Sequence, residues 1–272
     1  MNIDMCSDMV LRGEYDTNHV ALRGYSVAII EDSILGDSRV TTMVVRFPRC
    51  VLSEFNTHRV FSRNSASSRA RSYGSTLRSV LSSPYIPLMT VNQRGMSGRF
   101  VDTDSALYHD FADSVLEARD NAVESVLSML LGDKMPGVLD NDFEPAISLY
   151  ERLYAEDPES IPNVHKQVLN RFLEPFMWHE VVVTSSEWEN FFTLRCDIDT
   201  VDPAMFFLAN LMREVYNVSI PVSRLVHTPF VASGELSLGE ALLLSASACA
   251  SISYRDVSSN TQGSLQLAKR SP

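Results

Sequence analysis

One segment of the chain concentrates the side chains that could do chemistry. It covers residues 54–70 and reads EFNTHRVFSRNSASSRA. Its polar members include His58, Arg59, Arg63, Asn64, Ser65, Ser67, Ser68 and Arg69. Each such group would need a partner if it were buried, whereas guanidinium groups match phosphate oxygens two at a time. The segment therefore favours a site for phosphates and a heterocycle with carbonyl acceptors, and the alternative is a solvated Arg/Ser loop.

Charge narrows the class of ligand. From Arg46 to Arg78 the chain has seven arginines and one acid, Glu54, while the whole chain carries a formal net charge of −11. An acidic protein repels a polyanion, so we expect no nucleic-acid partner. A small anion held in a local positive pocket, such as a nucleotide or a dinucleotide cofactor, fits better. The cationic neighbours of His58 also favour a neutral, hydrogen-bonding form of this histidine.

Several common sites are absent from the sequence. There is no Gly-x-Gly-x-x-Gly, no Gly-Lys-Ser/Thr and no Gly-x-Ser-x-Gly, so a Rossmann, P-loop or serine-hydrolase site is unsupported. No His-Glu-x-x-His or paired Cys-x-x-Cys occurs, and we expect no metal. The four cysteines lie far apart, which is typical of reduced thiols in a cytoplasmic protein. No apolar run is long enough to cross a membrane, so no membrane partner is expected.

The elements that must position these residues can be read from spacing. Strands are predicted over 25–30, 40–47 and 179–184, with Pro48 ending the second. A helix is predicted over 53–63 with Ser53 as N-cap, followed by an irregular stretch over 64–100. Further helices are predicted over 102–131 (stopped by Gly132), 149–155, 163–173, 188–194 (capped by Ser185 or Ser186), 203–215 and 236–253.

This order of elements indicates the fold class. Helices and strands occur without regular βαβ alternation, which predicts an α+β fold in a single domain. We expect a mixed or antiparallel sheet with long helices. The domain is predicted to cover 1–256, and the polar residues 257–272 are predicted to form a C-terminal tail.

Two blocks of the sequence resemble the flavin-dependent thymidylate synthase family. His58-Arg59, then Asn64, Ser67 and Arg69, resemble its signature of Arg-His-Arg, seven residues and Ser, with an Asn inside and an Arg two positions after the Ser. The sequence Val45-Arg-Phe-Pro48 resembles the strand and proline that precede the signature. The family's second block is matched, in order and spacing, by residues 170–175, 184–186 and 190–195. The resemblance covers about 40–75 and 163–215.

The resemblance implies a role for each matching residue. Contacts to FAD would come from His58, Arg59, Asn64, Thr184, Ser185, Ser186 and Asn190. The nucleotide substrate would contact Glu54, Thr57, Ser67, Ser68, Arg69, Arg171 and Arg195. Arg195 and Ser67 would be catalytic, Arg195 by polarising a carbonyl of the pyrimidine ring. The fold implied is an α+β domain that assembles as a homotetramer with active sites shared between subunits.

The chain departs from the family pattern at named positions. Thr57 stands where the family has the first Arg of its signature, Glu54 where it has Gln, and Ser65 where it has Glu. Ser68 and Ala70 replace the flanking Gly and Tyr. Residues 37–39 stand where the family has a histidine-containing segment.

The expected activity is FAD-dependent C5-methylation of dUMP to dTMP with methylene-tetrahydrofolate and NADPH. The departures keep open a C5-hydroxymethylase or a UMP methylase on the same scaffold. A non-catalytic relative that binds flavin or nucleotide is a further alternative.

Overall fold

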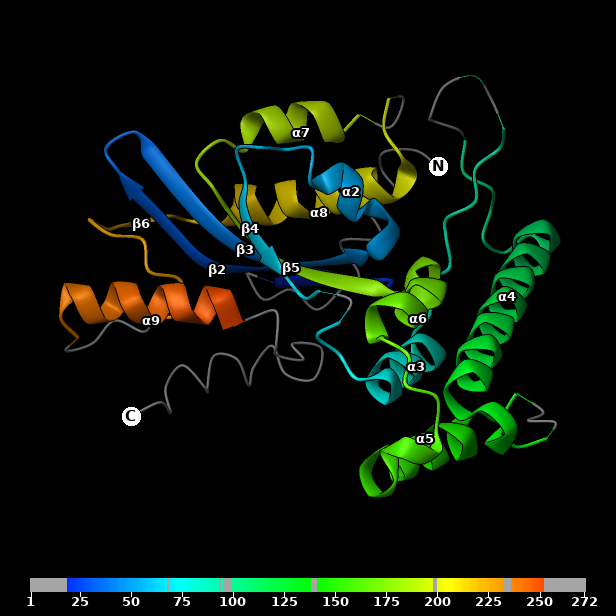
Figure 1. Ribbon diagram of the computed structural model, residues 1–272. Helices are drawn as coiled ribbons and strands as arrows, with labels where there is room; N and C mark the ends of the chain where they lie inside the picture. Colours follow the sequence, from blue (N-terminus) through cyan, green and yellow to red (C-terminus); the bar gives the residue numbers. More distant parts are fainter. Residues whose placement is uncertain are drawn as a thin grey trace.

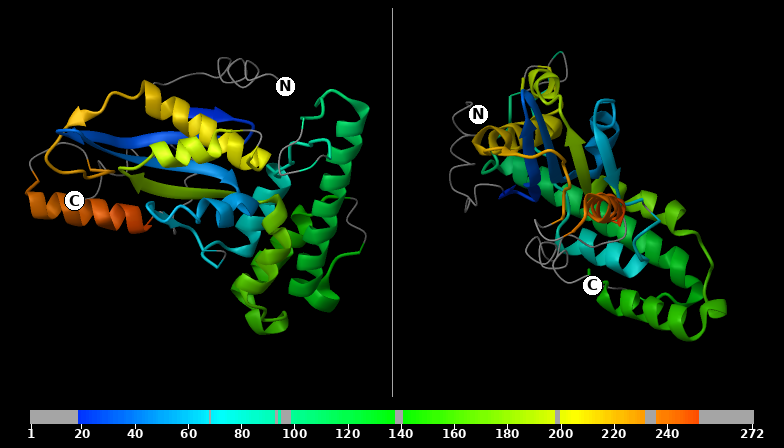
Figure 2. Two further views of the ribbon diagram at one scale, coloured as in Figure 1. Left: turned by 90° about the horizontal axis from the view of Figure 1, so that it is seen from above. Right: turned by 90° about the vertical axis from the view of Figure 1, so that its left-hand side faces the viewer.

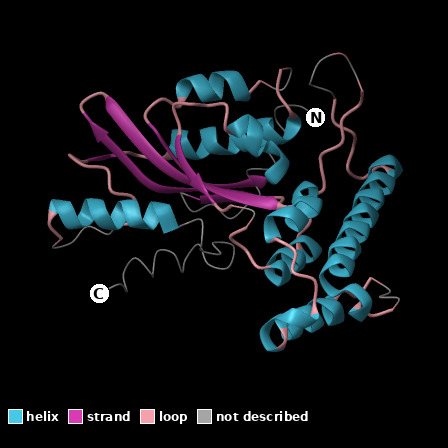
Figure 3. Ribbon diagram, viewed as in Figure 1, coloured by secondary structure: helices cyan, strands magenta, loops and turns pink. Residues whose placement is uncertain are grey.

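The computed structural model describes residues 19–67, 69–92, 94, 99–137, 141–197, 200–231 and 236–251. Within these ranges the chain builds one sheet with the strand order β1-β2-β3-β5-β4, while β6 pairs with β2 (Figures 1 and 3). The strands are β1 (His19–Leu22), β2 (Tyr25–Leu35), β3 (Ser38–Pro48), β4 (Ser62–Ser65), β5 (Trp178–Ser185) and β6 (Val222–Ser223). The β2–β6 pair is parallel and the other described pairs are antiparallel, so the predicted α+β class with a mixed sheet is confirmed.

The central hairpin is longer than its apolar pattern predicts. β2 continues to Leu35, although alternation stops near Ile30, because a register shift between Ile29 and Glu31 changes which face each side chain meets. After the shift Asp32 lies on the core side, where its carboxylate accepts hydrogen bonds from Arg39 and from the Thr41 hydroxyl. A buried carboxylate with such partners is tolerated, and so the strand persists through a polar run.

The two faces of the sheet are covered differently. One face packs against α7 (Glu189–Arg195) and α8 (Pro203–Val218), with Val45, Val181 and Val183 in the resulting core. On the other face Val44 and Val182 meet Phe230. In Figure 1, α7 and α8 lie above the sheet and α9 (Leu238–Ser251) lies below it. Because neighbouring residues of a strand point to opposite faces, this division decides which site residues can meet.

A second set of helices gathers at one end of the sheet (Figure 2). It contains α3 (Tyr73–Ser82), α4 (Ala106–Leu131), α5 (Glu144–Glu156) and α6 (Lys166–Leu173), which share a core that includes Leu127, Ile147 and Leu173. The predicted stop of α4 at Gly132 is confirmed: this residue follows the helix with φ +57°. None of the described helices is both long and apolar enough to cross a membrane.

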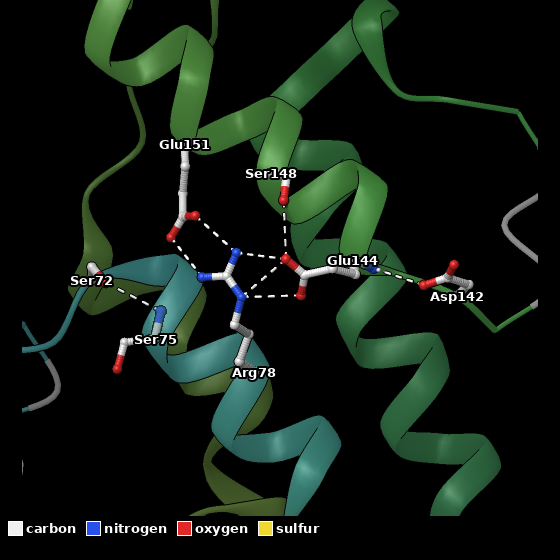
Figure 4. Close-up of polar contacts among 7 residues, drawn as sticks. All are labelled: Ser72, Ser75, Arg78, Asp142, Glu144, Ser148 and Glu151. Carbon is white, nitrogen blue, oxygen red and sulfur yellow. Dashed lines mark hydrogen bonds and ion pairs between the residues drawn. The ribbon is translucent and has the colours of Figure 1, made fainter. Parts of the chain in front are cut away.

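A three-residue charge cluster fastens α3 to α5 (Figure 4). Arg78 of α3 lies 2.7 Å from Glu144 and 2.8 Å from Glu151, both on α5. Ser148 donates a further hydrogen bond to Glu144 at 3.0 Å. All three charged side chains are exposed, so solvent and salt screen their attraction.

Two predictions about the segment around the signature are wrong. The helix predicted over 53–63 is only α2 (Leu52–Phe55), after which the chain turns and enters β4. Arg63 holds this turn, because its guanidinium donates to the side chain of Asn56 at 2.5 Å and to the carbonyl of Asn56 at 3.0 Å. The stretch predicted to be irregular over 64–100 contains α3, which Ser72 caps by accepting from the Ser75 N–H.

Other boundaries shift for local reasons. α5 begins at Glu144 rather than at 149, with a proline in its first turn. α6 begins at Lys166, and the His165 ring accepts from the Gln167 N–H as its cap. Neither Ser185 nor Ser186 caps α7: Ser185 accepts from the Glu187 N–H one turn earlier. The predicted tail over 257–272 lies outside the described residues.

Candidate functional site

Arg195 brings the two sequence blocks together. Its Nε donates to Nε2 of His58 at 2.9 Å, its Nη1 forms an ion pair with Glu54, and its Nη2 donates to the Thr57 hydroxyl at 3.3 Å. Arg195 is the last residue of α7, while its three partners lie in α2 and the turn that follows it. Four of the residues assigned to the site from sequence therefore share one cluster, although Arg195 and His58 are separated by 137 positions in the chain.

His58 is held neutral in this cluster. It is 7% exposed, and its ring packs edge-on against Phe191 at 4.8 Å between centroids and also contacts Phe61. Burial, followed by the charges of Arg195 and Arg63, lowers the pKa of His58 to about 4. Since Nε2 accepts from a guanidinium, the ring proton must lie on Nδ1. The predicted neutral form of His58 is confirmed, and the ring acts as an acceptor that orients Arg195.

Two of the positions that differ from the signature, Glu54 and Thr57, both contact Arg195. Glu54 supplies its counter-charge, and the Thr57 hydroxyl accepts from it while donating to the Glu54 carbonyl at 2.7 Å. Burial raises the pKa of Glu54; Arg195 opposes this shift, Asp202 adds to it, and the net change is upward. The cluster thus pairs one cation with one carboxyl group.

The guanidinium keeps donors for a ligand. A guanidinium has five N–H groups, and the contacts with described residues use three of them, one on each nitrogen. The remaining donors lie on Nη1 and Nη2. Because the side chain is already held from three directions, these donors have a fixed orientation. Such an arrangement suits a carbonyl or an oxyanion.

Other predicted site residues lie on the opposite face of the sheet. Asn64 pairs across β4 and β5 with Val182, and Thr184 follows two positions later, so both point away from α7 and α8. The Asn64 amide donates to the carbonyls of Cys249 and Ala250 at 2.9 and 3.0 Å, at the end of α9. The Thr184 and Thr42 hydroxyls are hydrogen-bonded at 2.6 Å. Ser185 is buried on the helix-covered face.

The remaining predicted residues are exposed at the surface. They are Arg59, Ser67, Arg69, Arg171, Ser186 and Asn190. Among the described residues, no side-chain hydrogen bond or ion pair joins any of them to Arg195. Ser68 lies outside the described residues. The assignment of Ser67, Arg69 and Arg171 to the nucleotide therefore stays a prediction.

The residues assigned to FAD lie in different parts of the chain's surface and core. His58 lies among aromatic rings on one side of the sheet, while Asn64 and Thr184 lie on the other. The side-chain amide of Asn64 and the hydroxyl of Thr184 already have partners in the protein. The residues assigned to FAD are therefore divided between the two faces of the sheet. Among the described residues, no group of three or more His, Cys, Asp or Glu side chains is placed to hold a metal ion.

A buried polar cluster was missed by the sequence reasoning. His227 contacts the Ser33 hydroxyl through Nδ1 at 2.6 Å and the Thr42 hydroxyl through Nε2 at 2.7 Å. Glu31 lies 4.0 Å from His227 and 3.6 Å from Arg224. Burial lowers the pKa of His227, which keeps the ring neutral. The one available signal was the polar run Glu31-Asp32-Ser33 after an apolar strand, because His227 stands in a segment without periodicity.

Comparisons with known proteins find a distant structural likeness and no sequence relative. No model of a known family matches the chain, and no curated protein matches it. It is similar to a UMP/dUMP methylase, PolB, from Streptomyces cacaoi, bound with 5-Br UMP: TM-score 0.43, 17% identity, covering 65% of this chain and 69% of that chain. The same methylase bound with 5-Br dUMP gives a TM-score of 0.41 and 15% identity, covering 68% of this chain and 74% of that chain.

Proposed function

We propose that this chain binds a uridine nucleotide, UMP or dUMP, and adds a one-carbon group to C5 of its pyrimidine ring. The observation that carries the proposal is the Arg195 cluster. Its four members come from the two blocks that resemble flavin-dependent thymidylate synthases. The resemblance places this arginine at the pyrimidine ring, and the structure gives it a fixed orientation with donors to spare.

The chemistry follows from that orientation. When C5 becomes a nucleophile, negative charge is shared between C5 and the neighbouring ring carbonyl, and the remaining donors of Arg195 would stabilise this charge until the new bond at C5 forms. The guanidinium needs little reorganisation because Glu54, Thr57 and His58 already hold it. Neutral His58 orients the cation without adding a charge. The carboxyl group of Glu54 offsets the charge of Arg195 in the unliganded site.

The cofactors remain those that the resemblance implies. FAD, when bound, would supply hydride chemistry, with methylene-tetrahydrofolate as the one-carbon donor and NADPH as the reductant. Exposed Ser67, Arg69 and Arg171 would bind phosphate where copies of the chain meet, as in a homotetramer with shared sites. Such sharing would also let residues on opposite faces of one sheet serve different active sites.

A second candidate is a relative that binds flavin or nucleotide without turnover. The observation that favours it is the internal use of the Asn64 amide and the Thr184 hydroxyl. The two candidates differ in whether product appears when all co-substrates are supplied. A UMP methylase or a C5-hydroxymethylase would use the same Arg195 cluster, and product mass and ribose type distinguish these outputs.

Variants of Arg195 test the proposal. Arg195→Ala removes the guanidinium group and should lower kcat by at least ~100-fold, which is the effect found when an enzyme loses one oxyanion donor. Arg195→Lys keeps the charge without the planar fork and should restore only a small part of the rate. Turnover is followed by nucleotide mass, and urea unfolding establishes that each variant is folded. A near-normal rate in a folded Arg195→Ala protein would remove Arg195 from the reaction.

A further inference from the structure

The C-terminal arm, defined here as residues 222–231 together with α9, crosses the face of the sheet opposite α7 and α8. Its first anchor is β6, which pairs with β2 and is continued by the Arg224 N–H donating to the Ile34 carbonyl at 3.1 Å. Its second anchor is His227, which contacts one hydroxyl from β2 and one from β3. The arm is therefore tied to two strands before α9 begins.

The third anchor lies at the far end of the arm. Asn64 of β4 donates both hydrogen bonds of its amide to the last carbonyls of α9. A helix end has carbonyls without intrahelical partners, so the amide acts as a cap supplied by another element. Within the arm, the Ser245 hydroxyl donates to the Pro229 carbonyl at 2.8 Å and braces α9 against the preceding segment.

The arm covers residues that the proposed function needs. Thr184 is joined through Thr42 to His227. Phe230 packs on Val44 and Val182 between the anchors, and its backbone has a φ of +69°. A bulky residue in the left-handed region is strained, and such strain persists only where surrounding contacts impose it. The closed position of the arm thus carries a cost that opening would relieve.

Apolar packing holds α9 only weakly. Four leucines of α9 are 44–72% exposed: Leu238, Leu242, Leu243 and Leu244. Ser245 is the one buried residue of α9. Arg224, in the segment before α9, adds an ion pair with Glu31 of β2 at 3.6 Å. An element with few buried apolar contacts opens at low free energy. The position of α9 therefore depends on a few hydrogen bonds. A ligand that offers the same acceptors can take the place of the arm in these hydrogen bonds.

We propose that the C-terminal arm is a displaceable cover that competes with a bound cofactor for Asn64. This inference rests on the proposed function, together with the FAD contact at Asn64 that the resemblance implies. The same amide hydrogens of Asn64 cannot point to the α9 carbonyls and to a cofactor at once. Closure of the arm and cofactor binding at Asn64 are therefore mutually exclusive, and the observed Kd equals the Kd of the open form divided by the fraction of molecules in which the arm is open.

The test measures FAD affinity and amide hydrogen exchange of the full chain. His227→Ala removes the second anchor and should speed exchange in α9 and tighten FAD binding at least threefold. Adding FAD to the unaltered chain should also speed exchange in α9. Ser245→Ala cuts the internal brace and should act in the same direction more weakly, which covers the case that His227→Ala does not fold. Leu243→Ala, on an exposed leucine without an anchor, is the matched control and should change neither quantity.

The outcomes separate this inference from the proposed function. FAD binding that leaves α9 exchange unchanged, or that is weakened by His227→Ala, overturns the competition and leaves the proposed function standing. Absence of FAD binding in the unaltered chain and in both anchor variants overturns the cofactor part of the proposed function, and the competition with it.

Discussion

At the scale of single residues, Arg195 is held by one carboxyl group and two hydrogen-bond acceptors. Glu54 provides charge, while His58 and Thr57 provide acceptors of fixed position. The side chains of Arg195 and Glu54 are only 19% and 22% exposed, so solvent screens the pair incompletely. The carboxyl group at position 54 and the short hydroxyl side chain at position 57 therefore complement each other around Arg195.

Glu54→Gln tests the match between Glu54 and Arg195. The variant leaves a largely buried guanidinium without its counter-charge, which should cost about 1–3 kcal/mol of unfolding free energy. Urea unfolding measures this cost, and Glu159→Gln at an exposed carboxyl group is the control. Adding Arg195→Gln should remove most of the penalty, because the two residues then no longer form a charge pair. A loss no larger than that of the control would show that the ion pair contributes nothing to stability.

The protonation of His58 is a second prediction at this scale. With a pKa of about 4, its ring should remain neutral from pH 7.5 down to pH 5 in an NMR titration. Arg195→Gln removes one of the charges that depress the pKa and should move the midpoint upward. A midpoint near 6.5 in the unaltered chain would contradict the buried, guanidinium-bound state.

At the scale of elements, the structure separates what local pattern can predict from what it cannot. The apolar spacing of α4 and α8 predicted both helices, and the valine-rich β3 and β5 were also found from sequence. The turn after α2 depends on Arg63 reaching back to Asn56, a contact without periodicity. The continuation of β2 depends on partners of Asp32 that come from elsewhere in the fold. Such side-chain hydrogen bonds, whether seven positions apart or far apart in the chain, decide element boundaries, and apolar spacing does not reveal them.

The candidate site, like the fold, could be predicted only in part from the sequence. The sequence identified the residues of the Arg195 cluster because their types match a known pattern. It did not reveal that Asn64 caps α9 or that His227 contacts Ser33 and Thr42. These contacts depend on the path of the chain after α8, where neither block of the resemblance applies.

The charge cluster of Arg78, Glu144 and Glu151, which joins α3 to α5, yields a prediction at the scale of elements. Arg78→Ala should lower the unfolding free energy by about 1 kcal/mol, because two exposed pairs share one guanidinium. Arg78→Lys should recover less than half of this, since an ammonium group cannot serve both carboxylates with the same fork geometry. Raising the salt concentration should shrink the difference between the variants and the unaltered chain. A loss that is independent of salt would point to packing rather than charge.

At the scale of the whole molecule, buried neutral histidines set the response to acid. His58 is 7% exposed and His179 is 5% exposed. Their pKa values lie at about 4 and about 3; burial is the main cause, and nearby arginines contribute. In the unfolded chain both would bind a proton near pH 6.5. The unfolded state therefore takes up protons first as the pH falls, and stability is lost from about pH 6.5 downward.

Between pH 7.5 and pH 6 this should cost on the order of 1 kcal/mol of unfolding free energy. The carboxyl groups with raised pKa values, Glu31 and Glu54, act in the opposite sense, but their ordinary values lie well below this window. Urea midpoints at pH 7.5 and 6 measure the change, with the His58→Phe variant expected to show a smaller one. Constant or rising stability over this interval would mean that the histidines are not buried as described.

The central claim is that the Arg195 cluster serves one-carbon transfer to C5 of a uridine nucleotide. The most direct measurement is the mass of UMP and of dUMP after incubation with the full chain, FAD, NADPH and methylene-tetrahydrofolate. The account predicts that one of the two nucleotides gains a methyl group, and that the gain disappears in Arg195→Ala. If both nucleotides keep their mass although the chain binds flavin and nucleotide, the claim is contradicted and the chain is a binding protein.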